Sequence, residues 1–120
     1  MGGALVDTHD FDVFLPKGPI RKLEVKTKKT AMTRAPKGYF ECSVCAHNAN
    51  QKADAYVFVR ISTKDPTRAW ICGFKERNRF FQQARFFRKG DTDASNKYKV
   101  HASCYNMNVS QLDSIARLRI

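Results

Sequence analysis

The sequence predicts a single mixed α/β domain, in which helices pack against a central sheet of about four or five strands. Three observations predict it. The chain has 120 residues, 42% of them hydrophobic, which is enough for one core without disulfides. Its first part carries a hairpin pattern, and its middle carries two apolar strand patterns followed by a helical one. Because no repeat or linker interrupts it, we treat residues 1–120 as one domain.

The first element is a β-hairpin over residues 10–28. Two prolines and a glycine within residues 16–19 predict the chain reversal. Hydrophobic and polar residues alternate on both sides of this turn, which is the period of a strand. The alternation places two pairs of charged residues on shared strand faces: Asp10 with Asp12, and Glu24 with Lys26.

The segments on either side of this hairpin are less regular. Residues 1–9 are short and contain glycine, so we expect a mobile lead-in rather than a packed element. Residues 27–38 are basic and contain no acid, and Pro36 and Gly38 predict a loop. Over residues 39–52 the periodicity is poor, and we expect a short, weak helix.

The middle of the chain predicts the centre of the sheet. Residues 53–62 are apolar on nearly both faces, as in a strand that is covered on two sides. A turn at residues 65–67 leads to another strand over 68–74. Residues 75–89 carry phenylalanines at near-helical spacing and predict a helix that Gly90 caps.

The last part of the chain predicts two smaller elements. Residues 91–96 read as a polar loop and 97–102 as a short strand. Ser110, with Asp113 three residues later, resembles a capping box and predicts the start of a last helix. The apolar positions of that helix are Leu112, Ile115 and Leu118.

The charge of the chain predicts a polyanionic partner. The formal net charge is +11, from 22 basic and 11 acidic residues spread along the sequence. A field of this sign favours binding to a polyanion, and solubility alone is the alternative explanation. The basic residues that we expect to contact phosphates lie in the loop after the hairpin and on the predicted helix. They are Lys28, Lys29, Arg34, Lys37, Arg77, Arg79, Arg85 and Arg88.

The four cysteines allow two interpretations. Cys42 and Cys45 are separated by two residues, with His47 and His101 nearby, which is compatible with structural zinc. Cys72 and Cys104 do not repeat that spacing. We therefore expect reduced, buried thiols without zinc or a disulfide. No apolar run is long enough for a membrane span, and the N-terminal residues lack a signal-peptide pattern, so we expect an intracellular protein.

The charged faces of the hairpin have a chemical use. Mg²⁺ takes oxygen ligands from one or two carboxylates and leaves other positions to water and substrate phosphate. A metal held in this way stabilises a phosphoryl transition state and acidifies a bound water, which a neighbouring lysine can orient. The plainer interpretation is that Glu24 and Lys26 are the solvent face of a half-buried strand.

These residues resemble a known family. Asp12, the turn, and then Glu24-Val25-Lys26 on the second strand are similar to the PD-(D/E)XK signature of restriction-endonuclease-like nucleases. The likeness continues more weakly through residues 53–60 and 69–74 and the helix after them. These later segments are similar to those of small members, many of which are encoded by phages or mobile elements.

The resemblance implies a fold, an activity and a site. It implies a metal-dependent DNA endonuclease that hydrolyses phosphodiester bonds with Mg²⁺ or Mn²⁺. Asp12 and Glu24 would bind the metal together with the main-chain carbonyl of Val25, and Lys26 would assist the attacking water. Asp10 is a second acid whose role stays open. Family members usually have a helix before the first strand, but only nine residues precede Asp10 here, so the expected core lacks it, or a second subunit supplies it, or the chain is a fragment.

Two further expectations follow. Cutting both strands of a duplex is simplest for a homodimer, and its surface would be either the hairpin, with Phe11, Val13 and Leu15, or the last helix. The alternative to an enzyme is a non-catalytic nucleic-acid-binding module, stabilised by zinc through Cys42 and Cys45.

Overall fold

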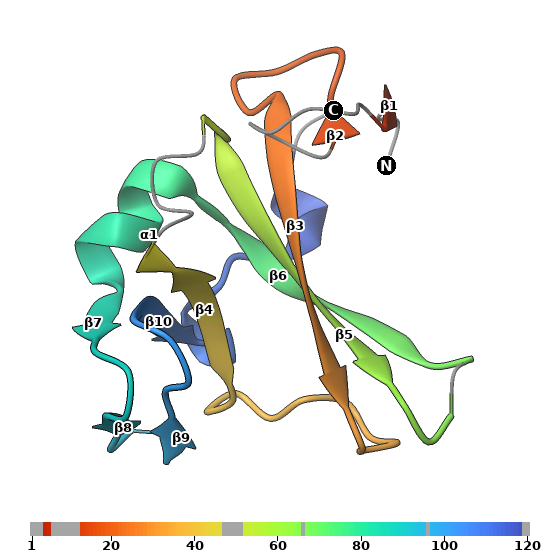
Figure 1. Cartoon of the computed structure of the whole chain (residues 1–120). Helices are drawn as coiled ribbons and strands as arrows, with labels where there is room; N and C mark the ends of the chain where they lie inside the picture. The colour runs from red at the N-terminus through yellow and green to blue at the C-terminus, as the bar shows by residue number, and fades with distance from the viewer. Residues whose placement is uncertain (1–3, 6–12, 47–51, 66, 96, 119–120) are drawn as a thin grey trace.

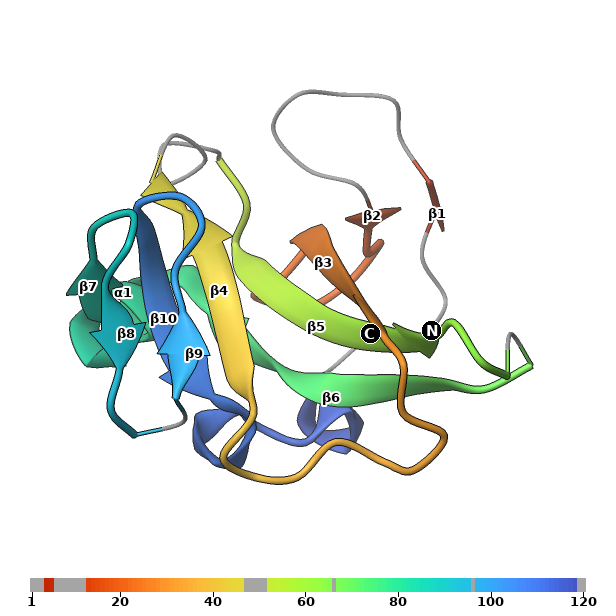
Figure 2. The same ribbon diagram turned by 60° about the horizontal axis from the view of Figure 1, so that its bottom comes forward.

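The computed structural model describes residues 4–5, 13–46, 52–65, 67–95 and 97–118. Its main sheet has five strands in the order β1-β2-β3-β5-β6 (Figure 1). A three-stranded sheet, β4-β10-β7, and a two-stranded one, β8-β9, lie beside it (Figure 2). The strands of the main sheet are β1 (Ala4–Leu5), β2 (Val13–Phe14), β3 (Lys22–Thr30), β5 (Ala55–Ser62) and β6 (Ala69–Glu76). The others are β4 (Glu41–Cys45), β7 (Arg85–Phe87), β8 (Thr92–Asp93), β9 (Tyr98–Lys99) and β10 (Cys104–Asn108).

The main sheet is mixed, as the sequence predicts. β2 and β3 pair antiparallel across a turn, with Val13 opposite Leu23. β3 then runs parallel to β5 over its whole length, from Leu23 opposite Ala55 to Thr30 opposite Ser62. β5 and β6 form an antiparallel pair. The predicted hairpin is therefore confirmed over its described residues, whereas Asp10 and Asp12 lie outside them.

β5 lies between β3 and β6 in the main sheet, and each of its faces lies against a different hydrophobic core. Tyr56 and Phe58 pack with Val44, Phe80 and Met107 on the side of the smaller sheet. Ala55 and Val57 pack on the opposite side with four other buried residues: Leu15, Leu23, Phe74 and Leu118. Two cores explain why the sequence of this strand is apolar on both faces, and they confirm its prediction as a strand covered on two sides.

The short helix predicted in residues 39–52 is wrong, because this region contains β4. Cys42 and Val44 alternate with Glu41, Ser43 and Cys45, and the first two are buried. That period of two is a strand pattern, but it is only five residues long. Pairing with β10 along the whole of β4 decides the outcome.

The helix predicted over residues 75–89 is much shorter than expected. α1 covers Arg77–Gln83, and Phe80 is its buried residue. Ala84 is already extended, with φ −69° and ψ 149°, and the chain continues as β7, which pairs with β10. Gly90 has φ 93° but lies seven residues beyond the helix end, so it does not cap α1. Since α1 is the one α-helix in the described part of the chain, the prediction of several helices against the sheet is not met.

The predicted last helix is also wrong. The structure has two 3₁₀ turns there, Val109–Gln111 and Ile115–Arg117, and β10 precedes them. The capping pair is Asn108 with Gln111 rather than Ser110 with Asp113. At the other end of the chain, Ala4–Leu5 forms β1 against β2, so the expected mobile lead-in is wrong for these residues. β3 also extends to Thr30, which shortens the predicted basic loop.

Among the described residues, no helix is long and apolar enough to cross a membrane.

Candidate functional site

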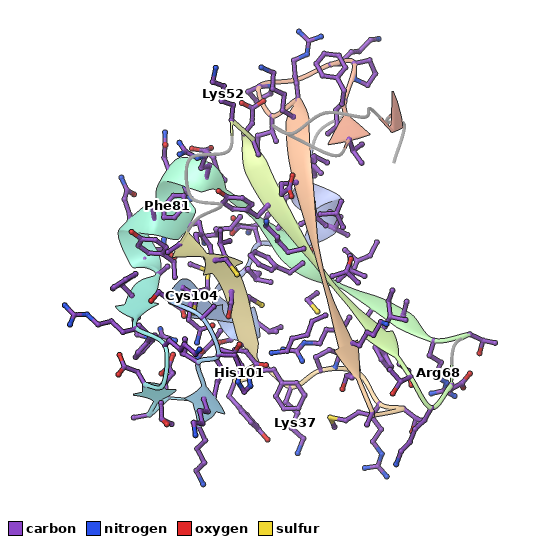
Figure 3. All side chains as sticks on the ribbon, viewed as in Figure 1. Lys37, Lys52, Arg68, Phe81, His101 and Cys104 are labelled. Carbon is purple, nitrogen blue, oxygen red and sulfur yellow. The ribbon has the colours of Figure 1, made fainter. Side chains whose placement is uncertain are left out.

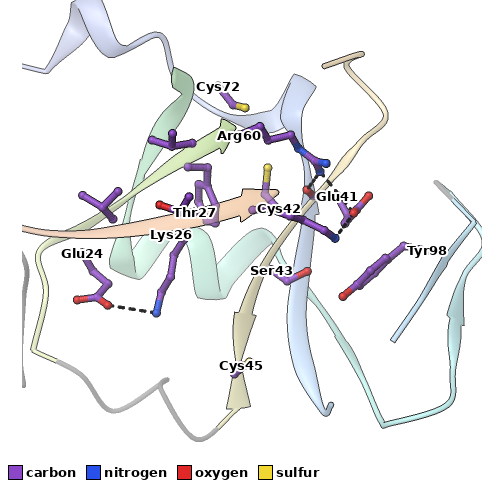
Figure 4. A pocket seen from close by; sticks show the side chains of 14 residues that line it. Glu24, Lys26, Thr27, Glu41, Cys42, Ser43, Cys45, Arg60, Cys72 and Tyr98 are labelled. Carbon is purple, nitrogen blue, oxygen red and sulfur yellow. Dashed lines mark hydrogen bonds and ion pairs between the residues drawn. The ribbon is translucent and has the colours of Figure 1, made fainter. Parts of the chain in front are cut away.

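A cavity of about 320 Å³ lies between β3 and β4, with β5 and β6 as its floor (Figure 4). Charged residues line both of its ends, and the middle is formed by small and apolar residues. Its lining comprises Glu24 to Lys28 of β3, Glu41 to Ser43 and Cys45 of β4, Phe58 to Arg60 of β5, Cys72 of β6 and Tyr98 of β9.

Glu24 and Lys26 lie together at one end of this cavity. Lys26 Nζ is 3.4 Å from Glu24 Oε1. Their side chains are only 12% and 17% exposed, respectively. Lys26 Nζ also lies 5.9 Å from the centre of the Tyr56 ring, a cation–π arrangement that supports the ammonium group. The predicted shared face of Glu24 and Lys26 therefore exists, and it is an inward-facing one rather than a freely solvated strand face.

A second charged group occupies the other end of the cavity. Lys28 Nζ donates a hydrogen bond to the carboxylate of Glu41, and it lies 4.2 Å from the centre of the Tyr98 ring. Arg60 Nη2 donates to the main-chain carbonyl of Glu41 at 2.6 Å and lies 3.4 Å from its carboxylate. Burial acts to raise the pKa of Glu41, but the hydrogen bond from Lys28 and the charge of Arg60 lower it overall.

Sequence reasoning missed Glu41, Arg60 and Tyr98 as site residues. Arg60 could have been noticed, because it is a charged residue within an otherwise apolar central strand. Such a side chain must find partners when the strand is buried on both faces. Glu41 and Tyr98 carry no local signal, since β4 and β9 reach the cavity only through tertiary packing.

The structure does not place every predicted metal ligand. Asp10 and Asp12 lie outside the described residues. Val13, which follows Asp12 in the chain, pairs with Leu23, the neighbour of Glu24. Val25 lies between Glu24 and Lys26 on β3. Within the ranges that the structure describes, there is no group of three or more His, Cys, Asp or Glu side chains that could hold a metal ion.

The predicted DNA-contacting residues fall into three groups. Five of them are exposed: Lys29, Arg34, Lys37, Arg79 and Arg88. Lys28 is bound to Glu41, and the Arg77 guanidinium lies 5.4 Å from the centre of the Phe81 ring. Arg85 is different, because its guanidinium donates hydrogen bonds to four side chains of the same chain: Asp93, Ser95, Asn108 and Gln111. We assign Arg85 to this internal network.

All four cysteines are free thiols. Cys42 and Cys45 are three residues apart on β4, so their side chains point to opposite faces of the strand. Cys42 lies in a core, where burial raises its pKa to about 12, whereas Cys45 lies opposite Cys104 on β10. One zinc ion could not be held by Cys42 and Cys45 without rearranging β4.

No family model matches this chain, and neither a curated protein nor a solved structure matches it.

Proposed function

We propose that this chain is a metal-dependent DNA endonuclease of the PD-(D/E)XK type, which hydrolyses phosphodiester bonds. The observation that carries the proposal is the Glu24–Lys26 pair, held at 3.4 Å at the end of an open cavity. A carboxylate and an ammonium group from one strand face are what this chemistry needs beside a phosphate. The net charge of +11 supports a polyanionic substrate.

The proposal assigns each residue a role. Glu24, Asp12 and the main-chain carbonyl of Val25 would hold a Mg²⁺ or Mn²⁺ ion, with Asp10 as a further acid. The oxygen-only donor set fits such an ion, whose remaining positions belong to water and the substrate phosphate. A bound ion would supply Lewis acidity, which would acidify a water and stabilise negative charge on the phosphoryl group. Lys26 would orient the attacking water and neutralise the developing charge, and the Tyr56 ring supports its ammonium group.

The restriction-endonuclease-like core belongs to the same proposal. The β2–β3 hairpin, which carries Glu24 and Lys26, followed along the chain by β5, β6 and α1, supports it. The proposed working unit is a homodimer.

The first prediction tests the proposed site. With Mg²⁺ or Mn²⁺ the purified protein should nick or cut plasmid DNA, and with Ca²⁺ it should bind DNA without turnover. Glu24→Ala and Lys26→Ala should each lower the cleavage rate by about a hundredfold or more, because each removes a group that acts in the transition state. Gel-based cleavage rates measure this.

The control for this experiment is Glu76→Ala, which removes an exposed carboxylate at the start of α1. It should cut at the parent rate. Circular dichroism should show that all three variants are folded. Equal cleavage by the parent, Glu24→Ala and Lys26→Ala would contradict the site.

The alternative is a non-catalytic nucleic-acid-binding module. One observation favours it: the charged residues of the cavity are ion-paired with one another, Lys26 with Glu24 and both Lys28 and Arg60 with Glu41. Such pairs can be purely structural. DNA binding without cleavage under any divalent cation would select this alternative, and zinc through Cys42 and Cys45 is not needed for it.

A further inference from the structure

Two segments that are distant in sequence meet at the end of β3 that lies away from Glu24. One is the loop that begins after Thr30, and the other is the turn between β5 and β6. Thr63 N donates to Thr30 O at 2.8 Å, and Arg68 Nη1 donates to Thr33 O at 2.9 Å. The two segments are therefore joined by one backbone hydrogen bond and one bond from a side chain to the backbone, and they form one surface.

This surface gathers positive charge. Its basic side chains are Arg34, Lys64 and Arg68, and we call these three residues the basic tip. All three are exposed. Arg34 and Lys64, from different segments, line one shallow hollow of about 460 Å³. Asp65, which lies 3.2 Å from Arg68, is the one acid in either segment. Figure 3 shows Arg68 at the opposite end of the main sheet from Lys52, which precedes β5.

The basic tip lies at a fixed distance from the proposed active site. Lys26 and Thr30 are both on β3, and the ladder to β5 continues from one to the other without interruption. Four residues of strand span about 13 Å. A duplex advances about 3.4 Å per base pair, so along a duplex that lies parallel to β3 the tip would be about four base pairs from a phosphate held at Lys26.

We propose that the basic tip is a second DNA-binding site, which contacts backbone phosphates of a duplex on one side of the cut. A duplex is the favoured partner because it holds its phosphates at a set spacing, which a rigid pair of strands can match. The inference rests on the proposed function for its choice of DNA. It adds Lys64 and Arg68 to the expected contacts, and it requires a substrate with about four or more base pairs flanking the cut on one side.

The test measures binding without turnover. Fluorescence anisotropy with Ca²⁺ gives the affinity for labelled duplexes of increasing length and the slope of log affinity against log salt. The variant Arg34→Gln/Lys64→Gln removes two charges but leaves the Arg68–Thr33 hydrogen bond. Its slope should be shallower by about 1.8, since each lost phosphate contact accounts for about 0.9. The parent should gain affinity as the flank reaches about four base pairs, whereas the variant should not.

The matched control is Lys17→Gln, in the turn between β2 and β3, where an exposed lysine lies at the other end of β3. It should keep the parent slope and the parent length dependence. An unchanged slope in the double variant would overturn the proposal, as would an equal loss in Lys17→Gln. Equal affinity for a single strand of the same length would overturn the choice of a duplex.

These outcomes are separate from those of the nuclease test. If the parent never cuts DNA but the double variant has a shallower slope of log affinity against log salt, the basic tip is supported and the nuclease is rejected. If the parent cuts DNA but the double variant binds DNA as the parent does, the nuclease is supported and the basic tip is rejected.

Discussion

Asp93 is the buried carboxylate that attaches the β8–β9 hairpin to the three-stranded sheet. It accepts hydrogen bonds from Arg85 Nη2 at 2.9 Å and Asn106 Nδ2 at 2.8 Å, and from the amide and hydroxyl of Ser95. Burial acts to raise its pKa, but the hydrogen bonds from Ser95, Arg85 and Asn106 outweigh burial, so the pKa lies below its ordinary value.

A pH-dependent stability follows from this pKa. Because the carboxyl of Asp93 has a lower pKa in the folded chain than in the unfolded chain, it stabilises the fold above about pH 4. That stabilisation is lost as the pH falls through the pKa of Asp93 in the folded chain.

Asp93→Asn should lower the free energy of unfolding by about 3 kcal/mol at pH 7, since it leaves the Arg85 guanidinium without its charged partner. The loss should be clearly smaller at pH 3. Urea unfolding at both pH values measures this, with Glu76→Gln as a surface control. The same loss at both pH values would contradict the role of the ionised carboxylate.

Single residues also show how far the site could be predicted. Strand periodicity was sufficient to predict that Glu24 and Lys26 share a strand face, because both lie on one strand and the alternation of its side chains is a local property. It could not find Glu41 or Tyr98, which reach the same cavity from other sheets. It also could not separate Arg85 from exposed arginines, since the partners of its guanidinium are eight or more residues away in the sequence.

At the scale of elements, β6 contains an irregularity that holds the C-terminal segment. Phe58 pairs with Gly73, but Val59 pairs with Ile71, so one extra residue is inserted into β6. Gly73 has φ +145°, and a Cβ atom there would lie 2.6 Å from Asp113 O and 2.9 Å from Leu112 Cβ. The next residue exchanges two backbone hydrogen bonds with Asp113, at 3.0 and 2.9 Å.

Gly73→Ala should therefore be strongly destabilising. It combines an unfavourable φ with a clash against backbone that is itself hydrogen-bonded, and we expect a loss of about 3 kcal/mol or more. Gly90→Ala is the matched comparison, because Gly90 also has a positive φ, of 93°, but has no atom near its missing Cβ. It should cost only about 1 kcal/mol. Thermal unfolding of both variants measures the difference, and equal losses would show that the clash with Asp113 is relieved at no cost.

The elements that sequence patterns predicted correctly are those with strong local signals. β5 and β6 are long and apolar, and the turn before β3 contains two prolines. The wrong predictions all concern segments whose conformation depends on distant partners. β4 and β7 both pair with β10, and that pairing outweighs the helical spacing of the phenylalanines beyond Gln83. Ile115 and Leu118 do pack against a core, but from a 3₁₀ turn rather than an α-helix.

At the scale of the whole molecule, the described residues of the surfaces expected to form a dimer pack within the fold, and Phe11 lies outside the described residues. Leu15 and Leu118 are buried in one core, and Val13 and Ile115 pack against it. The C-terminal segment thus covers one face of the main sheet. Neither the hairpin nor the last segment offers these side chains to a second copy.

The homodimer stays a prediction, and the surface most suitable for pairing with a second copy is the edge of the main sheet. β6 is the last strand of that sheet, and beyond its bridge to Asp113 its edge carries Ile71, which is 53% exposed. Edge strands with exposed apolar residues pair readily with a second chain.

Light scattering at several protein concentrations, with and without DNA, should give a mass of about twice 13.7 kDa. Ile71→Lys should reduce that mass, because it places a charge on the pairing edge. Phe86→Lys, which changes an equally exposed ring on β7, should not. A mass of 13.7 kDa under every condition would leave a monomer that cuts one strand at a time.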